Sequence, residues 1–389
     1  MKEELGELNA YQKPEPNLEV RTREGWQAYL GDEVPSPGEA VAILHPQHER
    51  VYAAVVRHLG ARRVELWAPY WPSWVEAGLA VERSYQTSAI NLTPGQGTPG
   101  QGTPGHAIVV PESEGIARIW PYAPTLTELQ GERPPLFLGL DAVDTIAPVV
   151  RGGLNLVIDT QDSPDHPSAL FTSLASHIRR ALSEESPELY VLDAASVFSD
   201  AHTLIAPGKT PDQQVSALRV AVALGAAQRG RHAEVLNVLC LPVLQEFRQV
   251  SAPQEAATQW GLRELVELLN THLASTHSTR QTTLLYLGIP PHLGGLAEII
   301  ETLCLGEVDA QLVITPEGRF NPERSVSRAD ISDAQQEKQQ QSLSMLARSS
   351  SALDRADLFG ESELSSSERD DINQANMLKV DLRSALASM

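Results

Sequence analysis

The stretch Arg151-Gly-Gly-Leu-Asn-Leu-Val-Ile-Asp-Thr-Gln-Asp-Ser-Pro-Asp-His-Pro-Ser168 decides how the fold is interpreted. Its apolar run Leu154–Ile158 predicts a buried strand, the polar residues after it predict a loop, and a helix is expected from about Ser168. A strand, a loop and a helix N-terminus together make a natural cradle for a phosphate group. This loop has no glycine and no lysine, and it carries Asp159, Asp162 and Asp165. The stretch is therefore laid out like a nucleotide site but lacks the chemistry that holds a phosphate.

Strands and helices alternate on the C-terminal side of this stretch. Predicted helices at 168–183, 213–229 and 260–273 separate apolar runs of strand length. The runs are Leu189–Leu192, Val235–Leu241, Thr282–Leu287 and Gln311–Ile314. Apolar runs buried on both faces and joined by helices favour a mostly parallel sheet. We therefore predict an α/β domain over residues 113–328.

The segments on either side differ from this domain. Residues 1–17 are charged and aperiodic, which predicts a flexible arm, and short β-like runs over 18–112 predict a small barrel-like domain. A duplicated Gln-Gly-Thr-Pro-Gly lies within residues 93–105, and this segment has too few apolar side chains to pack, so we expect a disordered surface loop there. Residues 329–389 are rich in Ser, Gln and Asp with a loose helical rhythm, clearest at 371–381, and predict a helical C-terminal domain.

Composition limits the classes of partner. The chain of 389 residues has 50 acidic and 30 basic side chains, a formal net charge of −20, which argues against nucleic acid because phosphate contacts need a basic surface. No apolar run approaches the roughly 18 residues of a membrane span, so no direct membrane insertion is expected. Met1–Glu19 does not resemble a signal peptide, and we expect a cytoplasmic protein. Cys240 and Cys304 lie in apolar runs and are interpreted as buried, reduced thiols.

Several segments, in their order and spacing, resemble the core subunits of rotary ATPases. That family contains the F-type α and β subunits, the V/A-type A and B subunits, and the ATPases of flagellar and type III export. The matching segments are Trp120-Pro121, Leu138–Gly153, Gly230–Ala233, Phe247–Ser251, Gly306–Ile314 and Ser325-Val-Ser-Arg328. The resemblance covers residues 120–328 in patches. It implies a RecA-like, P-loop NTPase-type domain between a small barrel and a helical C-terminal domain.

The departures from this family concern catalysis. The phosphate loop of the family is Gly-x-x-x-x-Gly-Lys-Ser/Thr, and a gap-free match from Arg151-Gly152 places Asp159 and Pro164 at its glycines. The lysine falls on Asp165 and the hydroxyl residue on His166. Asp159 puts a side chain where backbone should approach phosphate, and Pro164 has no N–H to donate. Asp165 reverses the required charge, and His166 is not the hydroxyl that holds Mg²⁺.

The remaining functional positions of the family are also altered, with one exception. The Walker B aspartate falls on Val238, with Leu239 beside it, and only Asp193 follows the strand where the water-orienting glutamate is expected. Arg328 matches the arginine that reaches the γ-phosphate of a neighbouring subunit. The resemblance therefore implies that Arg328 is an arginine finger; the alternative is an ordinary surface arginine at the start of a polar helix.

Other candidate residues carry weaker signals. His45 and His48 are close in sequence, but their three-residue spacing alone is weak evidence for a metal site. Asp159, Asp162 and Asp165, together with His166, could bind a hard cation or could form a solvated loop at the start of a helix. We interpret Asp141 and Asp144 as an exposed helix face. Ser251 and His272 lack a nucleophile elbow, and Lys209 follows a Pro-Gly turn rather than a strand, so all three are weak candidates.

Three hypotheses follow. The first is a non-catalytic relative of the rotary ATPase subunits that binds no cofactor and assembles with a homologous ATPase subunit, or with itself, in a ring. Such a ring could be peripheral to a membrane complex. The second is an active ATPase that uses ATP and Mg²⁺ through an atypical loop. The third is an acidic α/β protein, unrelated to the family, that binds a partner through its helical tail.

Overall fold

The computed structural model describes residues 16–21, 25–32, 34–93, 106–160, 167–205, 211–240, 266–289, 306–360 and 364–380, with Leu382 and Ala385. The arm 1–17 and the loop 93–105 fall almost wholly outside these residues. By its internal contacts the chain divides into two compact units, Met1–Pro121 and Tyr122–Met389. Each unit contains its own sheet and its own buried side chains.

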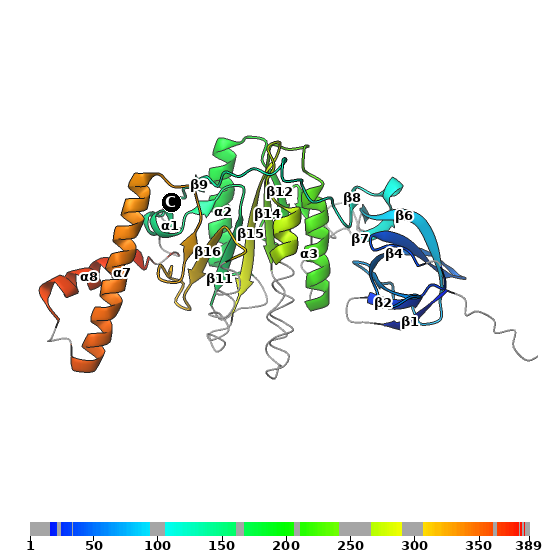
Figure 1. The fold of residues 1–389 in the computed structure, drawn as a ribbon, viewed down its shortest axis with the longest axis horizontal. Helices are drawn as coiled ribbons and strands as arrows, with labels where there is room; N and C mark the ends of the chain where they lie inside the picture. The colour runs from blue at the N-terminus through cyan, green and yellow to red at the C-terminus, as the bar shows by residue number, and fades with distance from the viewer. Residues whose placement is uncertain are drawn as a thin grey trace, which may run out of the picture. The chain divides into compact units, whose positions relative to one another are not determined.

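Six antiparallel strands of the first unit close into a ring, in the order β1-β2-β5-β4-β3-β6 (Figure 1). The pair Asn17–Ala80 joins β6 back to β1, and the Leu18 N–H donates to the Leu79 carbonyl at 2.9 Å. β7 and β8 extend the sheet from β6. The strands are β1 (Asn17–Arg21), β2 (Gly25–Tyr29), β3 (Glu39–His45), β4 (His48–His58), β5 (Arg63–Trp67), β6 (Ala80–Thr93), β7 (His106–Pro111) and β8 (Ala117–Arg118).

Small and β-branched side chains fill the centre of this ring. The segment Ala40–Ile43 of β3 is buried throughout, and Trp67 at the end of β5 is 1% exposed. Gly38, just before β3, has a φ of +89°, and a Cβ there would lie 2.8 Å from Trp120 Cδ1. Glycine is needed at this position, because both the backbone conformation and the indole exclude a side chain.

The second unit is built on a seven-stranded sheet in the order β13-β12-β14-β15-β11-β16-β17. Every neighbouring pair is parallel except β16–β17. The strands are β11 (Leu154–Asp159), β12 (Tyr190–Asp193), β13 (Thr203–Leu204), β14 (Glu234–Cys240), β15 (Arg280–Gly288), β16 (Ala310–Ile314) and β17 (Val326–Ser327). A short pair, β9 (Pro135–Leu136) and β10 (Val149–Val150), encloses α1 (Asp141–Ile146).

Helices cover both faces of this sheet. α2 (Ala169–Glu185) packs with α1 against the face that carries Val157, Leu236 and Leu284. On the other face α3 (Pro211–Ala226) approaches so closely that a Cβ on Gly225 would lie 2.7 Å from Asn237 Oδ1. The sheet interior is therefore dry on both sides, which explains why its strands read as continuous apolar runs.

The last two helices whose bounds the structure describes are α7 (Asp333–Phe359) and α8 (Ser366–Leu378) (Figure 1). Each begins at a capping box, with Ser332 and Gln335 in α7 and Ser365 and Glu368 in α8. Leu346 of α7 is buried in the same core as α1 and α2. The predicted helical tail is thus present, and the contacts group it with the α/β unit.

The coarse fold prediction is confirmed: an antiparallel sheet precedes a mostly parallel sheet with helices on both faces. None of the described helices combines the length and the apolar character that a membrane crossing requires.

Candidate functional site

The carboxyl end of β11 is where this topology favours a ligand. β12, the next described strand after β11, lies on one side of β11 beyond β15 and β14, whereas β16, the next described strand after β15, lies on the other side of β11. The strand order therefore reverses direction at β11. Ligands of open parallel sheets bind in the crevice that such a reversal leaves at the carboxyl ends of the strands. β11 ends there with Asp159.

Asp159 is fully buried at this point. Its backbone carbonyl accepts the Ile289 N–H at 2.7 Å. The next residue, Thr160, donates both its N–H, at 3.1 Å, and its hydroxyl, at 2.7 Å, to the carbonyl of Ile314. In a phosphate cradle the backbone N–H groups after the strand point to the ligand. Here the N–H of Thr160 is used inside the protein.

A buried tyrosine closes the space between β11 and α2. Tyr286 of β15 is 1% exposed and contacts Phe171 of α2, with ring centroids 4.6 Å apart. Burial, with the nearby Asp159 and Cys240 in support, raises the pKa of its phenol, and its hydrogen bond to Ser168 lowers it. Ser168 in turn caps α2 by accepting the Phe171 N–H at 3.1 Å. These residues bring acidic and neutral groups together and include no basic side chain.

Only the first of the four predicted loop residues can be placed. Asp159 is buried, as described above, whereas Pro164, Asp165 and His166 lie outside the described residues, as does Asp162. The Walker B positions Val238 and Leu239 are fully buried in the sheet.

Asp193 at the end of β12 has a structural role in its own loop. Its Oδ1 accepts the Ala195 N–H at 2.8 Å, and its Oδ2 accepts the N–H groups of Val197 and Phe198 at 2.7 and 2.6 Å. Burial raises the pKa of this carboxyl, and the backbone donors, including Ser196, oppose the rise. Both oxygens of this fully buried carboxylate accept backbone N–H groups, so Asp193 fastens its own loop.

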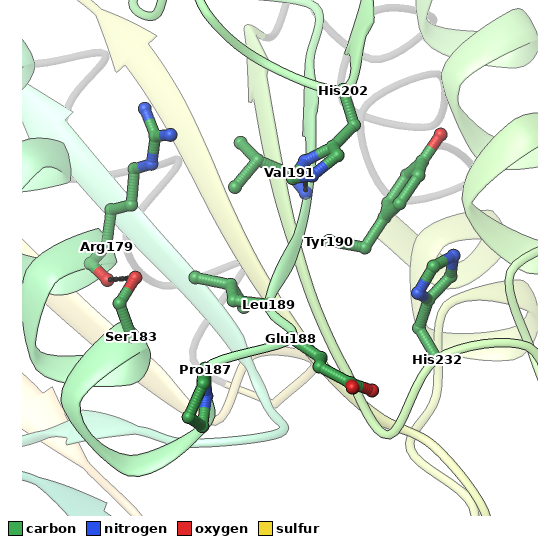
Figure 2. Close-up of a pocket in the computed structure, with 9 residues that line it drawn as sticks. All are labelled: Arg179, Ser183, Pro187, Glu188, Leu189, Tyr190, Val191, His202 and His232. Atoms are coloured by element: carbon green, nitrogen blue, oxygen red, sulfur yellow. Dashed lines mark hydrogen bonds between the residues drawn. The ribbon is translucent and has the colours of Figure 1, made fainter.

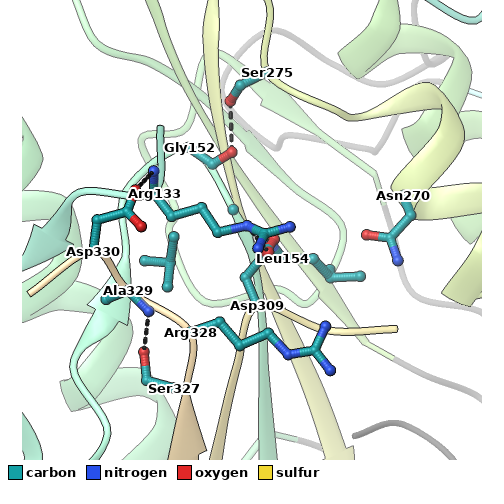
Figure 3. Close-up of polar contacts among 12 residues, drawn as sticks. Arg133, Gly152, Leu154, Asn270, Ser275, Asp309, Ser327, Arg328, Ala329 and Asp330 are labelled. Atoms are coloured by element: carbon teal, nitrogen blue, oxygen red, sulfur yellow. Dashed lines mark hydrogen bonds and ion pairs between the residues drawn. The ribbon is translucent and has the colours of Figure 1, made fainter. Parts of the chain in front are cut away.

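Arg328 lies beside Asp309 and near Leu154, the first residue of β11 (Figure 3), whereas Asp159 is the last residue of that strand. Its N–H donates to the Asp309 carbonyl at 2.8 Å, just before β16, and its Nη1 donates to the Gly306 carbonyl at 3.2 Å. The Asp309 carboxylate also accepts the Leu154 N–H at 2.9 Å, at the start of β11. Arg328 and Asp159 are thus not brought together within one chain. The arginine side chain is exposed.

Asp309 holds this region together. Its Oδ1 lies 2.8 Å from Arg133 Nε. The segments of Arg133 and Asp330 also exchange hydrogen bonds: the Arg133 N–H donates to Asp330 Oδ2 at 2.6 Å, and the Asp330 N–H donates to the Arg133 carbonyl at 2.7 Å. The backbone that carries Arg328 is therefore fixed from both sides, which is what a side chain presented to another molecule requires.

The interpretation of Asp141 and Asp144 as an exposed face is wrong for Asp144. That carboxylate accepts the N–H groups of Leu138 and Gly139 at 2.9 and 2.8 Å and is partly buried. It fastens the turn before α1 to the helix. Asp144 lies in the first turn of α1, so its carboxylate can reach the N–H groups of the chain that leads into the helix.

The weaker candidates gain nothing from the structure. His48 stacks on Trp74, the tilted ring of His45 contacts both, and His45 Nδ1 accepts the Gln47 N–H at 3.0 Å. The neutral ring of His45 must then carry its proton on Nε2, which leaves no lone pair there for a metal. No cluster of three metal-ligating side chains occurs among the residues that the structure describes. Burial raises the pKa of the Cys240 thiol to about 12, as expected for an inert cysteine.

Ser251, Lys209 and Cys304 lie outside the described residues. His272 is described, and burial lowers the pKa of its imidazole.

Tyr286 is the residue that sequence reasoning missed. It lies inside the apolar run Thr282–Leu287 and looks like one more core side chain. The one available signal was its hydroxyl, because a buried tyrosine usually needs a hydrogen-bond partner.

No protein-family model matches the chain, and comparison with curated proteins finds no match.

Proposed function

We propose that this protein is a non-catalytic relative of the rotary ATPase α/β-type subunits, with a RecA-like central domain that serves as a scaffold. The observation that carries the proposal is the closed carboxyl end of β11. Asp159 is buried there, the Thr160 N–H is bonded to Ile314, and Tyr286 lies between strand and helix. A phosphate needs free N–H donors and positive charge at this place, and a carboxylate repels it.

The order of parts supports the same proposal. A closed ring of antiparallel strands comes first, a mostly parallel sheet with covered faces follows, and a helical pair ends the chain. The third hypothesis, an unrelated acidic α/β protein, gives no reason for a ring of strands before Trp120. The resemblance to the family rests on segments within 120–328, whereas the ring of strands and the terminal helices lie outside that range, so the two observations are independent.

Within the proposal, the partner is a homologous ATPase subunit, or a second copy of this chain, in a ring. Arg328 would then act on the nucleotide of the neighbour. An arginine that serves a neighbouring site need not lie beside its own loop, and Arg328 lies near the start of β11, whereas Asp159 ends that strand. Such an arginine contributes on the order of 10³–10⁵ to the rate in related phosphoryl-transfer systems.

An ATPase assay on the purified chain tests the loss of catalysis. We expect no turnover of ATP with Mg²⁺. Turnover that disappears in Asp165→Ala would contradict the proposal and favour the active-ATPase alternative with ATP and Mg²⁺ as cofactors.

A second assay tests the role of Arg328 with a co-expressed homologous catalytic subunit. We expect Arg328→Ala to lower the rate of the complex by about 10³ or more. Arg348→Ala removes one positive charge from an exposed pair with Asp371 and serves as the matched control. Equal rates for the two variants would exclude the finger role.

A further inference from the structure

Strand β13 lies at the outer edge of the seven-stranded sheet, and a side chain helps to attach it to β12. Strand β13 pairs with β12 at Leu192–Thr203 and Asp193–Leu204. One residue earlier on β12, the Val191 N–H donates to His202 Nδ1 at 3.1 Å (Figure 2). The imidazole of His202 thus takes the place of a backbone acceptor at the point where β13 begins.

Ring contacts add to this attachment. The His202 ring stacks on Tyr190, the first residue of β12, with centroids 5.0 Å apart and an interplanar angle of 23°. Tyr190 also contacts His232, at 4.6 Å, and its hydroxyl lies 2.5 Å from Thr203 Oγ1. The beginning of β13 is therefore held to β12 largely by side chains, since the strand itself is two residues long.

Protons from solvent can reach these rings. Tyr190, His202 and His232 line a pocket of about 420 Å³, which the C-terminal half of α2 borders with Arg179 and Ser183 (Figure 2). A ring that lines such a pocket can exchange its proton without unfolding of the unit.

The bond from Val191 requires one protonation state of His202. A ring nitrogen accepts a hydrogen bond only through a free lone pair, so Nδ1 must be unprotonated and Nε2 carries the proton of the neutral ring. The imidazolium has N–H groups at both positions and would point a donor at the donor of Val191. Protonation at Nδ1 and the bond to Val191 are mutually exclusive.

We propose that His202 is a pH-sensitive latch for the edge of this sheet. The neutral ring holds β13 on β12, and protonation releases the beginning of β13 and frees the Val191 N–H. The latch is closed at higher pH and opens as the pH falls, because only the neutral form makes the bond.

Charged groups lie around the ring of His202. Asp200, two residues before His202, attracts an imidazolium, and the pKa of Asp200 is lowered by its hydrogen bond from Arg179 and also by His202. Arg179 pairs with Asp200 at 2.7 Å and thereby weakens this attraction. Glu188 and His232 also line the pocket, and they act in opposite directions, with Glu188 favouring the protonated ring and a protonated His232 opposing it.

Hydrogen exchange of the Val191 amide, followed by NMR on the full chain and corrected for intrinsic exchange rates, tests the latch. We expect protection of Val191 to fall by about tenfold or more between about pH 8 and about pH 5. The Leu236 amide in the central strand β14 is the internal reference and should keep its protection. Unchanged protection of Val191 over this range would overturn the proposal.

Two substitutions separate a latch from a structural histidine. His202→Asn places an amide oxygen near the position of Nδ1 and cannot titrate, so protection should be high at both pH values. His202→Ala should give low protection at both. If His202→Asn instead retained the pH dependence of the natural protein, another group would be responsible and the proposal would be wrong.

Discussion

The carboxylate of Asp159, at the carboxyl end of β11, lies near enough to the phenol of Tyr286 to raise its pKa. Both residues are buried, and the charge of Asp159 adds to the effect of burial in raising the pKa of Tyr286. A phosphate would have to enter next to this carboxylate. The pair therefore explains in physical terms why the loop after β11 is expected not to bind a nucleotide.

The raised pKa of Tyr286 predicts a loss of stability in alkali. The folded protein keeps the phenol protonated at pH values where the unfolded chain ionises, so the free energy of unfolding falls as the pH rises above about 10. Tyr286→Phe removes the titrating group and should lose less stability over this range. Chemical denaturation at several pH values measures both proteins. Tyr122→Phe, at an exposed tyrosine, is the control. The same loss of unfolding free energy in alkali for all three proteins would contradict the prediction.

Asp193→Asn is predicted to destabilise the second unit by about 2–4 kcal/mol. Both carboxylate oxygens accept backbone N–H groups, so an amide must turn its NH₂ group toward donors. Thermal or denaturant unfolding measures the effect. Asp141→Asn, at an exposed position of α1, should leave stability nearly unchanged. A stable Asp193→Asn protein would show that the carboxylate is free for another role.

Arg151→Met is predicted to destabilise the protein by about 3–5 kcal/mol, because it leaves Glu234 buried without its partner. Arg151 Nη2 lies 2.9 Å from Glu234 Oε2, and the glutamate side chain is 3% exposed. Burial raises the pKa of Glu234, and Arg151 opposes the rise. Without Arg151 the folded state binds a proton more tightly than the unfolded state, so the deficit should shrink as the pH falls.

Denaturant unfolding as a function of pH measures this deficit. The double variant Arg151→Met with Glu234→Gln should recover a large part of the lost stability, since no buried charge remains. Arg348→Met breaks an exposed pair and should have little effect. If Arg151→Met instead lost more unfolding free energy as the pH fell, the prediction would be wrong.

Asp309→Ala should cost far more stability than Arg328→Ala. Asp309 accepts the Leu154 N–H and pairs with Arg133, whereas Arg328 is exposed and keeps its backbone hydrogen bond after truncation. We expect about 2–3 kcal/mol for Asp309 and less than about 1 kcal/mol for Arg328. Comparable losses would mean that Arg328 is a structural residue rather than one presented to a partner.

Much of the fold could be predicted because its signals are local. Buried parallel strands appear as uninterrupted apolar runs, and the predicted run Leu154–Ile158 differs from β11 by one residue at its end. The helix predicted from about Ser168 begins at Ala169, with Ser168 as its cap. The long helix α7 was harder to recognise, because a mostly exposed helix has no continuous apolar face and only its capping box marks its start.

The candidate site was less predictable because it depends on contacts between distant segments. The approach of Tyr286 to Asp159 follows from the pairing of β15 with β11, which joins residues far apart in the chain. The burial of Asp144 and the closed hydrogen bonding of Asp193 depend on turn geometry that the residue types alone do not specify. The sequence could name the acidic residue after the strand, but not the tyrosine that closes the site.

Isothermal titration of the purified full chain with ATP and with ADP, each with Mg²⁺, decides whether this protein binds a nucleotide. We expect no saturable heat of binding at ligand concentrations of about 1 mM, because the Thr160 N–H is bonded to Ile314 and Asp159 is buried next to it. Binding with a dissociation constant of about 1 μM would overturn the proposal of a non-catalytic subunit and make an active nucleotide site the better explanation.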